Sequence, residues 1–425
     1  MDIAEREAAT AAATRSLITD KQTGYPSCLR PTRLVINKVT DGCNLSCRYC
    51  SAGAGTCSTA KMTLDTFRAA VDFVLSGSDL RPLLWVFHGG EPLLMGWRWL
   101  RHAMGQGRSA CTRRGVPIRY GLVTNGTLID TDLASLFADE QVSVCVSLDG
   151  PPEIHNALRS DGVTALRGLR LLKKYKVGHR VLGVLHQHNW NRIPEVADFL
   201  ISEGQMFPKF NVLHHAGRAL SLRPLQPHQI ETAREDFLAR MESSGGRFAE
   251  VNTTGFLLRF LGLHQPLSSP GCSTIVCAAG KGYLGVGHDG AVFPCGRAND
   301  LERDRWRMGN VFAGLAAELA GNVLRDFHRA GSRADCYLCD AADLCDYLCP
   351  ANRIASELNA HLHCQATRLF ASRLQRLGEV EIEALRAIAR RLLEDIPRDC
   401  GLPWSVSTTY PMVTQESTLV VRDQS

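Results

Sequence analysis

The sequence of 425 residues has no apolar run long enough to cross a membrane, a length of about 18 residues. Its first residues, MDIAEREAATAAATRS, carry acidic side chains where a secretory signal has an apolar core. The net charge is only +5, too small to favour a nucleic acid or an anionic membrane as a partner. The sequence also lacks internal repeats and low-complexity linkers. We therefore expect a cytoplasmic protein that binds neither membranes nor nucleic acids.

Cysteine, by contrast, is abundant. The chain has 16 cysteines without a secretory signal, which favours metal binding or redox chemistry over a disulfide scaffold. Apolar residues make up 45% of the chain and charged residues 21%, which are ordinary values for a globular protein. The length is sufficient for two domains.

Strand and helix patterns alternate from residue 34 to about 215. Helical periodicities such as LDTFRAAVDFVL separate short apolar runs rich in β-branched residues, which predicts parallel strands with crossover helices. The expected strands are residues 34–39, 83–87, 118–123, 142–148, 181–185 and 210–213. Six such units predict an α/β fold with a partial (β/α)6 barrel. In a barrel of this kind, the chemistry lies at the carboxyl ends of the strands.

The stretch DGCNLSCRYCS directly follows the first predicted strand. It places Cys43, Cys47 and Cys50 in a C-x3-C-x2-C spacing. Tetrahedral zinc and iron–sulfur sites usually have four protein ligands, so three thiolates leave one coordination position open. An open position is typical of a catalytic metal site. A zinc site or buried thiols would produce the same spacing.

This spacing resembles that of the radical S-adenosylmethionine (SAM) superfamily. HGGEP, TNG and SLDG follow the second, third and fourth predicted strands, where the family has motifs that contact SAM. The resemblance implies a [4Fe-4S] cluster whose open iron binds SAM, and cleavage of SAM to a 5′-deoxyadenosyl radical that abstracts a substrate hydrogen. Arg159, after the fourth strand, is a further candidate for the SAM carboxylate. The expected SAM-binding residues are Tyr49, Gly89, Gly90, Glu91, Thr124, Asn125, Ser147, Asp149 and Arg159.

Eight further cysteines lie between residues 272 and 364. CYLCDAADLCDYLC has a C-x2-C-x5-C-x3-C spacing, and GYLGVGHDGAVFPC predicts a hairpin about Asp289 and Gly290. This region resembles the SPASM domain, which carries two auxiliary [4Fe-4S] clusters and would bring the total to three. Zinc is the alternative, because C-x2-C pairs also build zinc ribbons. The resemblance assigns one cluster to Cys272, Cys277, Cys295 and Cys349, and the other to Cys336, Cys339, Cys345 and Cys364.

The remaining cysteines are expected to have structural roles, apart from Cys57 in the loop after the first cluster, which is a candidate catalytic residue. Cys145 falls inside the fourth strand and is predicted to be buried. His214 and His215 end the sixth strand and are candidates for contact with substrate. The five cysteines outside the three predicted clusters are Cys28, Cys57, Cys111, Cys145 and Cys400.

The motifs together predict a radical SAM maturase that forms an oxidative cross-link in a ribosomally made precursor peptide. Formylglycine formation, as in the anaerobic sulfatase maturases, is one alternative. In those enzymes an aspartate follows the cysteine of the G-x4-C motif and acts as a base, whereas Cys295 here precedes Gly296. A small-molecule dehydrogenase and a noncatalytic metal protein are two further alternatives.

The expected partners are the peptide and a reductant such as flavodoxin or ferredoxin. We expect the peptide to be bound by the C-terminal tail, by the cysteine-rich domain or by a separate leader-binding protein. We expect an N-terminal extension over residues 1–32, the barrel over 33–255, the SPASM domain over 256–370, and a helical extension with a tail over 371–425.

Overall fold

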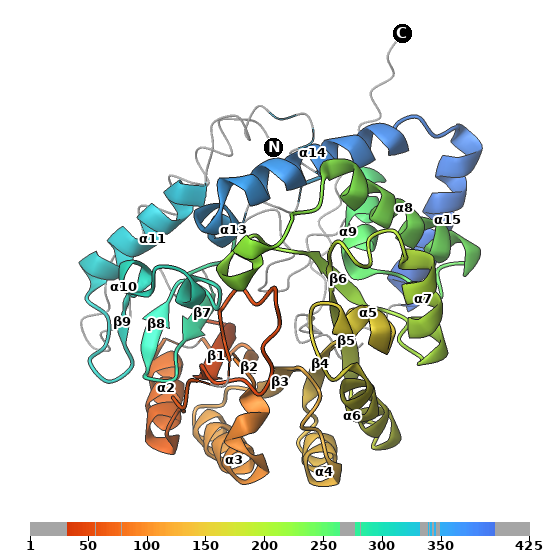
Figure 1. Cartoon of the computed structure of the whole chain (residues 1–425). Helices are drawn as coiled ribbons and strands as arrows, with labels where there is room; N and C mark the ends of the chain where they lie inside the picture. Colours follow the sequence, from red (N-terminus) through yellow and green to blue (C-terminus); the bar gives the residue numbers. More distant parts are fainter. Residues whose placement is uncertain are drawn as a thin grey trace.

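The computed structural model describes residues 32–395, apart from positions 56, 78, 264–276, 281, 332–338, 340, 342–343 and 346–348. Two predicted cluster ligands, Cys272 and Cys336, lie outside the described residues, as do Cys28, Cys400, residues 1–31 and the tail. Within the described part, the strands form one nine-stranded sheet in the order β6-β5-β4-β3-β2-β1-β7-β8-β9. Figure 1 shows this sheet curving with helices outside it.

The first six strands are parallel to their neighbours and follow one another in order across the sheet, which confirms the predicted α/β fold. All seven residues of β1 are buried, as expected of a parallel strand covered on both faces. The fourth strand is shorter at each end than the predicted 142–148. The bounds are β1 Leu34–Thr40, β2 Leu83–Gly89, β3 Ile118–Thr124, β4 Ser143–Ser147, β5 His179–Leu185 and β6 Lys209–Val212.

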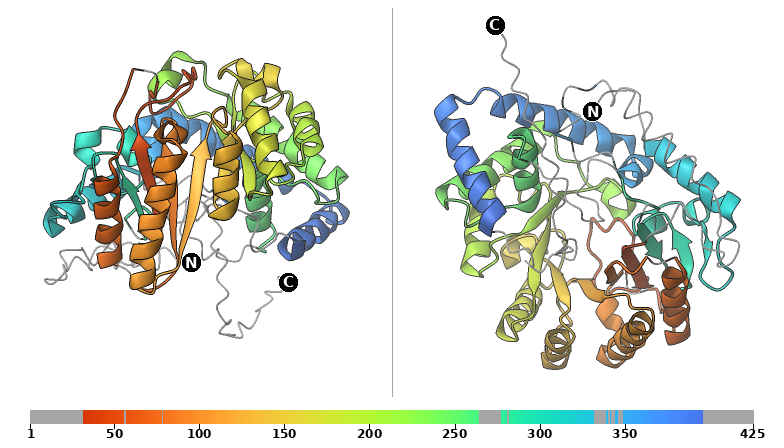
Figure 2. Two further views of the ribbon diagram at one scale, coloured as in Figure 1. Left: turned by 90° about the horizontal axis from the view of Figure 1, so that it is seen from below. Right: turned by 180° about the vertical axis from the view of Figure 1, so that it is seen from behind.

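Crossover helices return the chain between these strands along the outside of the curve (Figures 1 and 2). Two of them begin at side-chain caps: Thr63 accepts a hydrogen bond from the Thr66 amide, and Asp130 accepts one from the Leu133 amide. The helices are α2 Leu64–Ser76, α3 Trp97–Arg113, α4 Thr131–Asp139, α5 Pro152–Asn156, α6 Gly162–Lys174 and α7 Ile193–Ser202.

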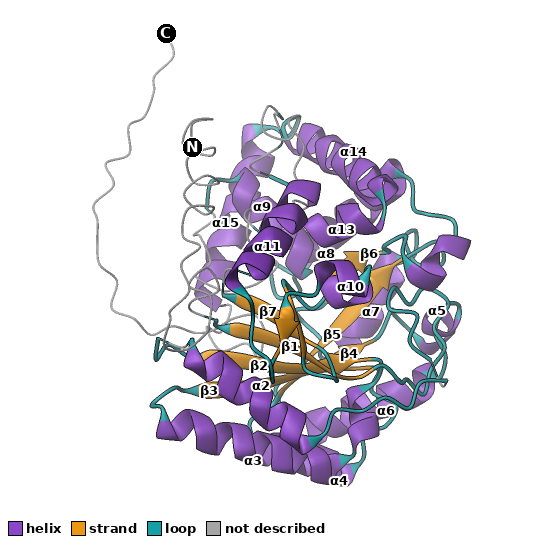
Figure 3. Ribbon diagram, turned by 90° about the vertical axis from the view of Figure 1, so that its left-hand side faces the viewer, coloured by secondary structure: helices purple, strands orange, loops and turns teal. Residues whose placement is uncertain are grey.

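The cysteine-rich half of the chain continues the same sheet. β7 (Tyr283–Val286) pairs in parallel with β1, and β8 (Ala291–Phe293) and β9 (Gly309–Asn310) follow in antiparallel order. The predicted hairpin about Asp289 and Gly290 is confirmed. Figure 3 shows β7 beside β1 in the sheet. The barrel strands and the hairpin therefore share one hydrophobic core.

The remaining helices cover the open side of the partial barrel, where α14 extends from α13 towards α15 (Figure 1). The sequence predicted one amphipathic helix over 366–396, but the structure has two, with a break at residues 375–378. A second core joins α8, α9, α14 and α15. The bounds are α8 Pro227–Ser243, α9 Val251–Phe260, α10 Arg303–Trp306, α11 Ala317–Gly331, α13 Pro350–Ala355, α14 Glu357–Leu374 and α15 Glu379–Asp395.

Candidate active site at the carboxyl ends of the strands

The loop after β1, residues 41–58, carries the three clustered cysteines and is tied to the barrel by its main chain. The Arg48 amide donates to the Leu158 carbonyl at 2.8 Å, and within the loop the Cys43 amide donates to the Gly55 carbonyl at 3.0 Å. Cys43 is buried, and this burial raises the pKa of its thiol to about 11. Cys47 and Cys50 are half-buried. In the metal-free protein, Cys43 is therefore a neutral thiol.

These three cysteines have the donor chemistry of an iron–sulfur cluster. They share one short loop and form no disulfide. Ser46 and residues 52–55 of the same loop line a cavity of about 480 Å³. In the described part of the chain, no group of three or more His, Cys, Asp or Glu side chains is arranged to hold a single metal ion.

Two glycines at the end of β2 allow the HGGEP turn to contact the cysteine loop. Gly89 has φ +132°, and a Cβ on it would lie 2.2 Å from the Thr40 carbonyl oxygen. A Cβ on Gly90 would lie 2.1 Å from the Gly42 carbonyl oxygen. Both glycines were predicted to bind SAM; in the structure they let this turn contact the backbone of the loop.

Glu91 follows these glycines, caps the short helix η2 (Pro92–Met95) and is 1% exposed. Its Oε1 accepts hydrogen bonds from the Leu93 amide at 3.0 Å and from Thr124 Oγ1 at 2.8 Å. Its Oε2 accepts one from the Asn125 amide at 2.8 Å. Burial raises the pKa of Glu91 to about 7 despite these donors. The HGGEP and TNG motifs, predicted to bind one ligand, thus meet at this carboxyl group.

Asn125 connects the TNG turn to the cysteine loop. Its Nδ2 donates to Asn44 Oδ1 at 2.9 Å and lies 3.9 Å from Cys43 Sγ. Its Oδ1 accepts from the Thr127 amide at 2.9 Å, and Asn44 in turn donates to Thr127 Oγ1 at 2.9 Å. The third strand's turn is therefore held directly against the first cysteine.

A second polar centre lies at the end of β4, where the carboxylate of the fully buried Asp149 accepts a hydrogen bond from the Tyr49 hydroxyl at 2.5 Å. Arg159 Nε lies 3.3 Å from the same carboxylate oxygen and also donates to the Tyr49 hydroxyl. Burial would raise the pKa of Asp149, but Arg159 and His186 outweigh it and hold this pKa well below its usual range. Tyr49, Asp149 and Arg159, predicted separately as SAM contacts, thus form one hydrogen-bonded group.

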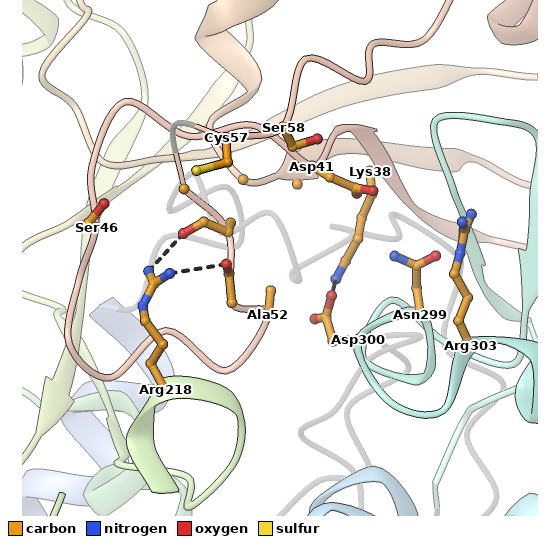
Figure 4. A pocket seen from close by; sticks show the side chains of 15 residues that line it. Lys38, Asp41, Ser46, Ala52, Cys57, Ser58, Arg218, Asn299, Asp300 and Arg303 are labelled. Carbon is orange, nitrogen blue, oxygen red and sulfur yellow. Dashed lines mark hydrogen bonds and ion pairs between the residues drawn. The ribbon is translucent and has the colours of Figure 1, made fainter. Parts of the chain in front are cut away.

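The cavity opens between the cysteine loop and the segment after β8. Lys38 of β1 points to Asp300 of η4 (Ala298–Asp300) and forms an ion pair with it, as Figure 4 shows. Gly89 and Gly90 form part of the wall. The cavity is thus bounded by both the barrel and the cysteine-rich half of the chain.

Other predicted site residues lie at separate positions. Ser147 is buried at the end of β4, and Cys57 is exposed and lines the cavity. Burial lowers the pKa of His214 well below its usual value. His215 packs with α14: its amide donates to Asn359 Oδ1 at 2.7 Å, and its Nε2 lies 3.0 Å from the Leu222 carbonyl oxygen.

The predicted ligands of the two auxiliary clusters that the structure describes lie in the segments around β7, β8, α13 and α14. Cys295 is buried and Cys364 is exposed, while the others are half-buried. Arg368 donates to Cys339 Sγ at 3.4 Å. Next to Cys295, a Cβ on Gly296 would lie 2.6 Å from Ile36 Cγ2 in β1. Gly296 therefore has no room for a side chain. The half-buried cysteines in this set are Cys277, Cys339, Cys345 and Cys349.

Sequence reasoning missed three residues of this site. His186, after β5, has its Nε2 3.6 Å from Asp149 Oδ2, and Asn44 binds Asn125. Arg218 follows β6 and donates to carbonyl oxygens of the cysteine loop. For His186 and Asn44 the position directly after a strand or a cysteine was an available signal, because polar residues at the strand ends of a barrel meet at one face. Arg218 lies six residues beyond β6 and had no such signal.

Comparisons with known proteins agree with this geometry. Residues 37–200 match the model of the Radical SAM superfamily. The chain is 28% identical over 368 residues to the cysteine-type anaerobic sulfatase-maturating enzyme of Clostridium perfringens (strain 13 / Type A), covering 80% of this chain and 95% of that enzyme. It is 26% identical to the serine-type enzyme of Klebsiella aerogenes, covering 77% of this chain and 82% of that one.

Two solved structures share the fold. Native anSMEcpe with bound AdoMet and Cp18Cys peptide superposes with a TM-score of 0.68 at 23% identity, covering 85% of this chain and 99% of that chain. Streptococcus suis SuiB bound to precursor peptide SuiA has a TM-score of 0.56 at 14% identity, covering 79% and 75%. At these identities the comparison concerns the fold alone, and it confirms the predicted partial barrel.

Proposed function

We propose that this chain, which carries a radical SAM domain and is homologous to the anaerobic sulfatase maturases, oxidises a cysteine or serine side chain of a peptide or protein to formylglycine. The main support is that the similarity to the cysteine-type maturase covers 80% of this chain, well beyond the matched domain, and 95% of the relative. This similarity favours formylglycine formation over oxidative cross-linking, the activity expected from the motifs.

A radical SAM domain implies one [4Fe-4S] cluster and SAM; when bound, they supply a 5′-deoxyadenosyl radical that abstracts hydrogen. Cys43, Cys47 and Cys50 would hold this cluster. Glu91 would receive the SAM ammonium, because a buried carboxyl group whose pKa is raised to about 7 is stabilised in its charged form by a nearby cation. Tyr49, fixed by Asp149 and Arg159, would border the adenine.

Two auxiliary [4Fe-4S] clusters on the cysteines from 272 to 364 are the further part of this proposal, with zinc as the rival. Iron, sulfide and zinc per chain should be measured after anaerobic reconstitution. Three clusters predict about twelve irons per chain. About four irons with roughly two zincs would instead leave the auxiliary cysteines without electron-accepting clusters, and the oxidative mechanism would lose its electron acceptor.

Peptide cross-linking stays a second candidate because of one specific feature. Gly296, which follows Cys295, packs against Ile36 and has no room for the carboxylate base of the sulfatase maturases. An enzyme without that base at this position has to remove the substrate proton in another way or carry out a different oxidation.

Mass spectrometry after anaerobic turnover separates the two candidates. The reduced enzyme, SAM and a short peptide with a single cysteine or serine should give 5′-deoxyadenosine and a product that reacts with hydrazine as an aldehyde. The matched control peptide carries alanine at that position. A product that has lost two hydrogens without reacting with hydrazine would support cross-linking and reject formylglycine formation.

A further inference from the structure

Arg218 connects the end of the barrel to the far part of the cysteine loop. It lies in η3 (Gly217–Ser221), which follows β6, and is about 170 residues from the loop it contacts. Its Nε donates to the Cys47 carbonyl at 2.8 Å, and its two terminal nitrogens donate to the Gly53 carbonyl at 3.0 Å and the Ala54 carbonyl at 2.7 Å. Figure 4 shows this guanidinium directed at the loop.

The main chain next to Arg218 contacts the same loop. The Arg218 amide donates to the Cys50 carbonyl at 3.1 Å. Gly217 has φ +56°, and a Cβ on it would lie 2.4 Å from the Ser51 carbonyl oxygen and 2.6 Å from that of Cys50. Gly217 and Arg218 therefore hold the loop at Cys47 and Cys50 from the side of β6. Position 217 requires glycine, because a side chain there would collide with the loop.

The chemistry of the guanidinium suits this task. Arginine stays protonated at all relevant pH values, and its planar fork donates several hydrogen bonds in a fixed geometry. All three of these side-chain hydrogen bonds go to carbonyl oxygens, and among the described residues no carboxylate forms an ion pair with it. A positive charge thus lies beside the loop. Charge and hydrogen bonds near an iron–sulfur cluster are main determinants of its reduction potential.

We infer that Arg218 is a positioning residue for the first cluster: its fork fixes the loop segment 47–54 that carries Cys47 and Cys50, and its charge stabilises the reduced cluster. This inference rests on the radical SAM part of the proposed function, and it is independent of the peptide that the enzyme modifies.

The test compares Arg218→Met and Arg218→Lys with wild type and with the matched control Arg223→Met, which changes an exposed arginine five residues further on. After anaerobic reconstitution, we would measure the rate of iron loss to a chelator. The midpoint potential would be taken from the EPR signal that changes when SAM is added, because that signal reports the first cluster.

Loss of the three guanidinium hydrogen bonds and loss of the positive charge should have separate effects. Both Arg218 variants should lose iron several-fold faster than Arg223→Met, because neither donates three fixed hydrogen bonds. Only Arg218→Met should have a more negative midpoint potential, since lysine retains the charge. Gly217→Ala keeps Arg218 but displaces the loop, so it should also speed up iron loss.

Two results would overturn the inference. The first is an Arg218→Met protein whose iron-loss rate and midpoint potential equal those of Arg223→Met. The second is a lowered melting temperature of the metal-free Arg218 variants together with wild-type iron retention in Arg218→Lys, which would show a role in folding alone. No peptide enters this experiment, so a failed peptide reaction leaves it standing, whereas a wild-type chain that binds no cluster rejects both proposals.

Discussion

Two buried carboxyl groups, one after β2 and one after β4, have opposite pKa shifts because their surroundings differ in charge. Glu91 accepts hydrogen bonds from two amides and one hydroxyl, and burial dominates, raising its pKa to about 7. Asp149 is equally buried but has Arg159 at 3.3 Å, and its pKa is held low. Among the described residues no cation forms an ion pair with Glu91, whereas Asp149 forms one with Arg159.

The raised pKa of Glu91 makes the metal-free protein less stable as pH rises. The unfolded chain releases this proton near pH 4.5 and the folded chain near pH 7, so stability falls between those values and is constant above them. A shift of this size corresponds to about 3 kcal/mol. Glu91→Gln removes the titration, so urea unfolding should show the variant gaining about that much relative to wild type from pH 4.5 to 8.

The control for this measurement is Asp72→Asn, which changes an exposed acid in α2 and should leave the pH profile of wild type unchanged. Parallel profiles for Glu91→Gln and wild type would show that burial does not control the ionisation of Glu91.

Gly296 is expected to tolerate no side chain. Gly296→Ala would place a Cβ 2.6 Å from Ile36 Cγ2 and 2.8 Å from Ile36 Cβ in a fully packed strand, so we expect a loss of about 1–3 kcal/mol in the free energy of unfolding. The matched control is Gly105→Ala in α3, where a Cβ meets no atom within 4 Å and should stabilise by about 0.5–1 kcal/mol. A Gly296→Ala protein as stable as wild type would contradict the close packing on β1.

Among the elements, α15 contributes Leu385 and Leu392 to the second core. Leu385 is fully buried there with Phe256 and Phe370, so Leu385→Ala should reduce the free energy of unfolding by about 2–5 kcal/mol. Leu393 lies on the same helix but is 44% exposed, and Leu393→Ala should have little effect. Equal denaturation midpoints for the two variants would show that α15 does not dock on the protein in solution.

The elements also show which patterns were readable in the sequence. The buried parallel strands appear as continuous apolar runs, and all six observed strands begin within two residues of the predicted start. α14 was missed before residue 366 because its buried face includes Asn359 and His363, polar side chains that break the apolar periodicity. Asn359 accepts a hydrogen bond from the His215 amide after β6, and His363 lies 3.5 Å from a guanidinium nitrogen of Arg234 in α8.

At the scale of the whole molecule, β7 joins the cysteine-rich half to the barrel. It lies between β1 and β8, and the buried Asn37 side chain of β1 donates to the Val286 carbonyl at 3.2 Å. We expect the barrel and the hairpin to unfold together. Native-state hydrogen exchange should give the Leu284 and Leu122 amides the same free energy of opening. Exchange of Leu284 at a clearly lower free energy would show that the hairpin opens separately.

The sequence by itself determined the alternation of strands and helices, the positions of the three clustered cysteines and the polar motifs at the strand ends. These features depend on local periodicity and short spacings, which a single sequence displays directly. They were enough to predict the partial barrel and to predict that most residues of the site lie on one face of it.

Only the tertiary structure decided how these residues pair. Glu91 meets Thr124 and Asn125 because β2 and β3 are neighbours, and β7 meets β1 although about 250 residues separate them. Arg218 reaches the cysteine loop across about 170 residues of the chain. Contacts of this kind arise because the curved sheet brings strand ends that are distant in the sequence to one face of the partial barrel. The local sequence pattern does not indicate which side chains then lie within hydrogen-bonding distance.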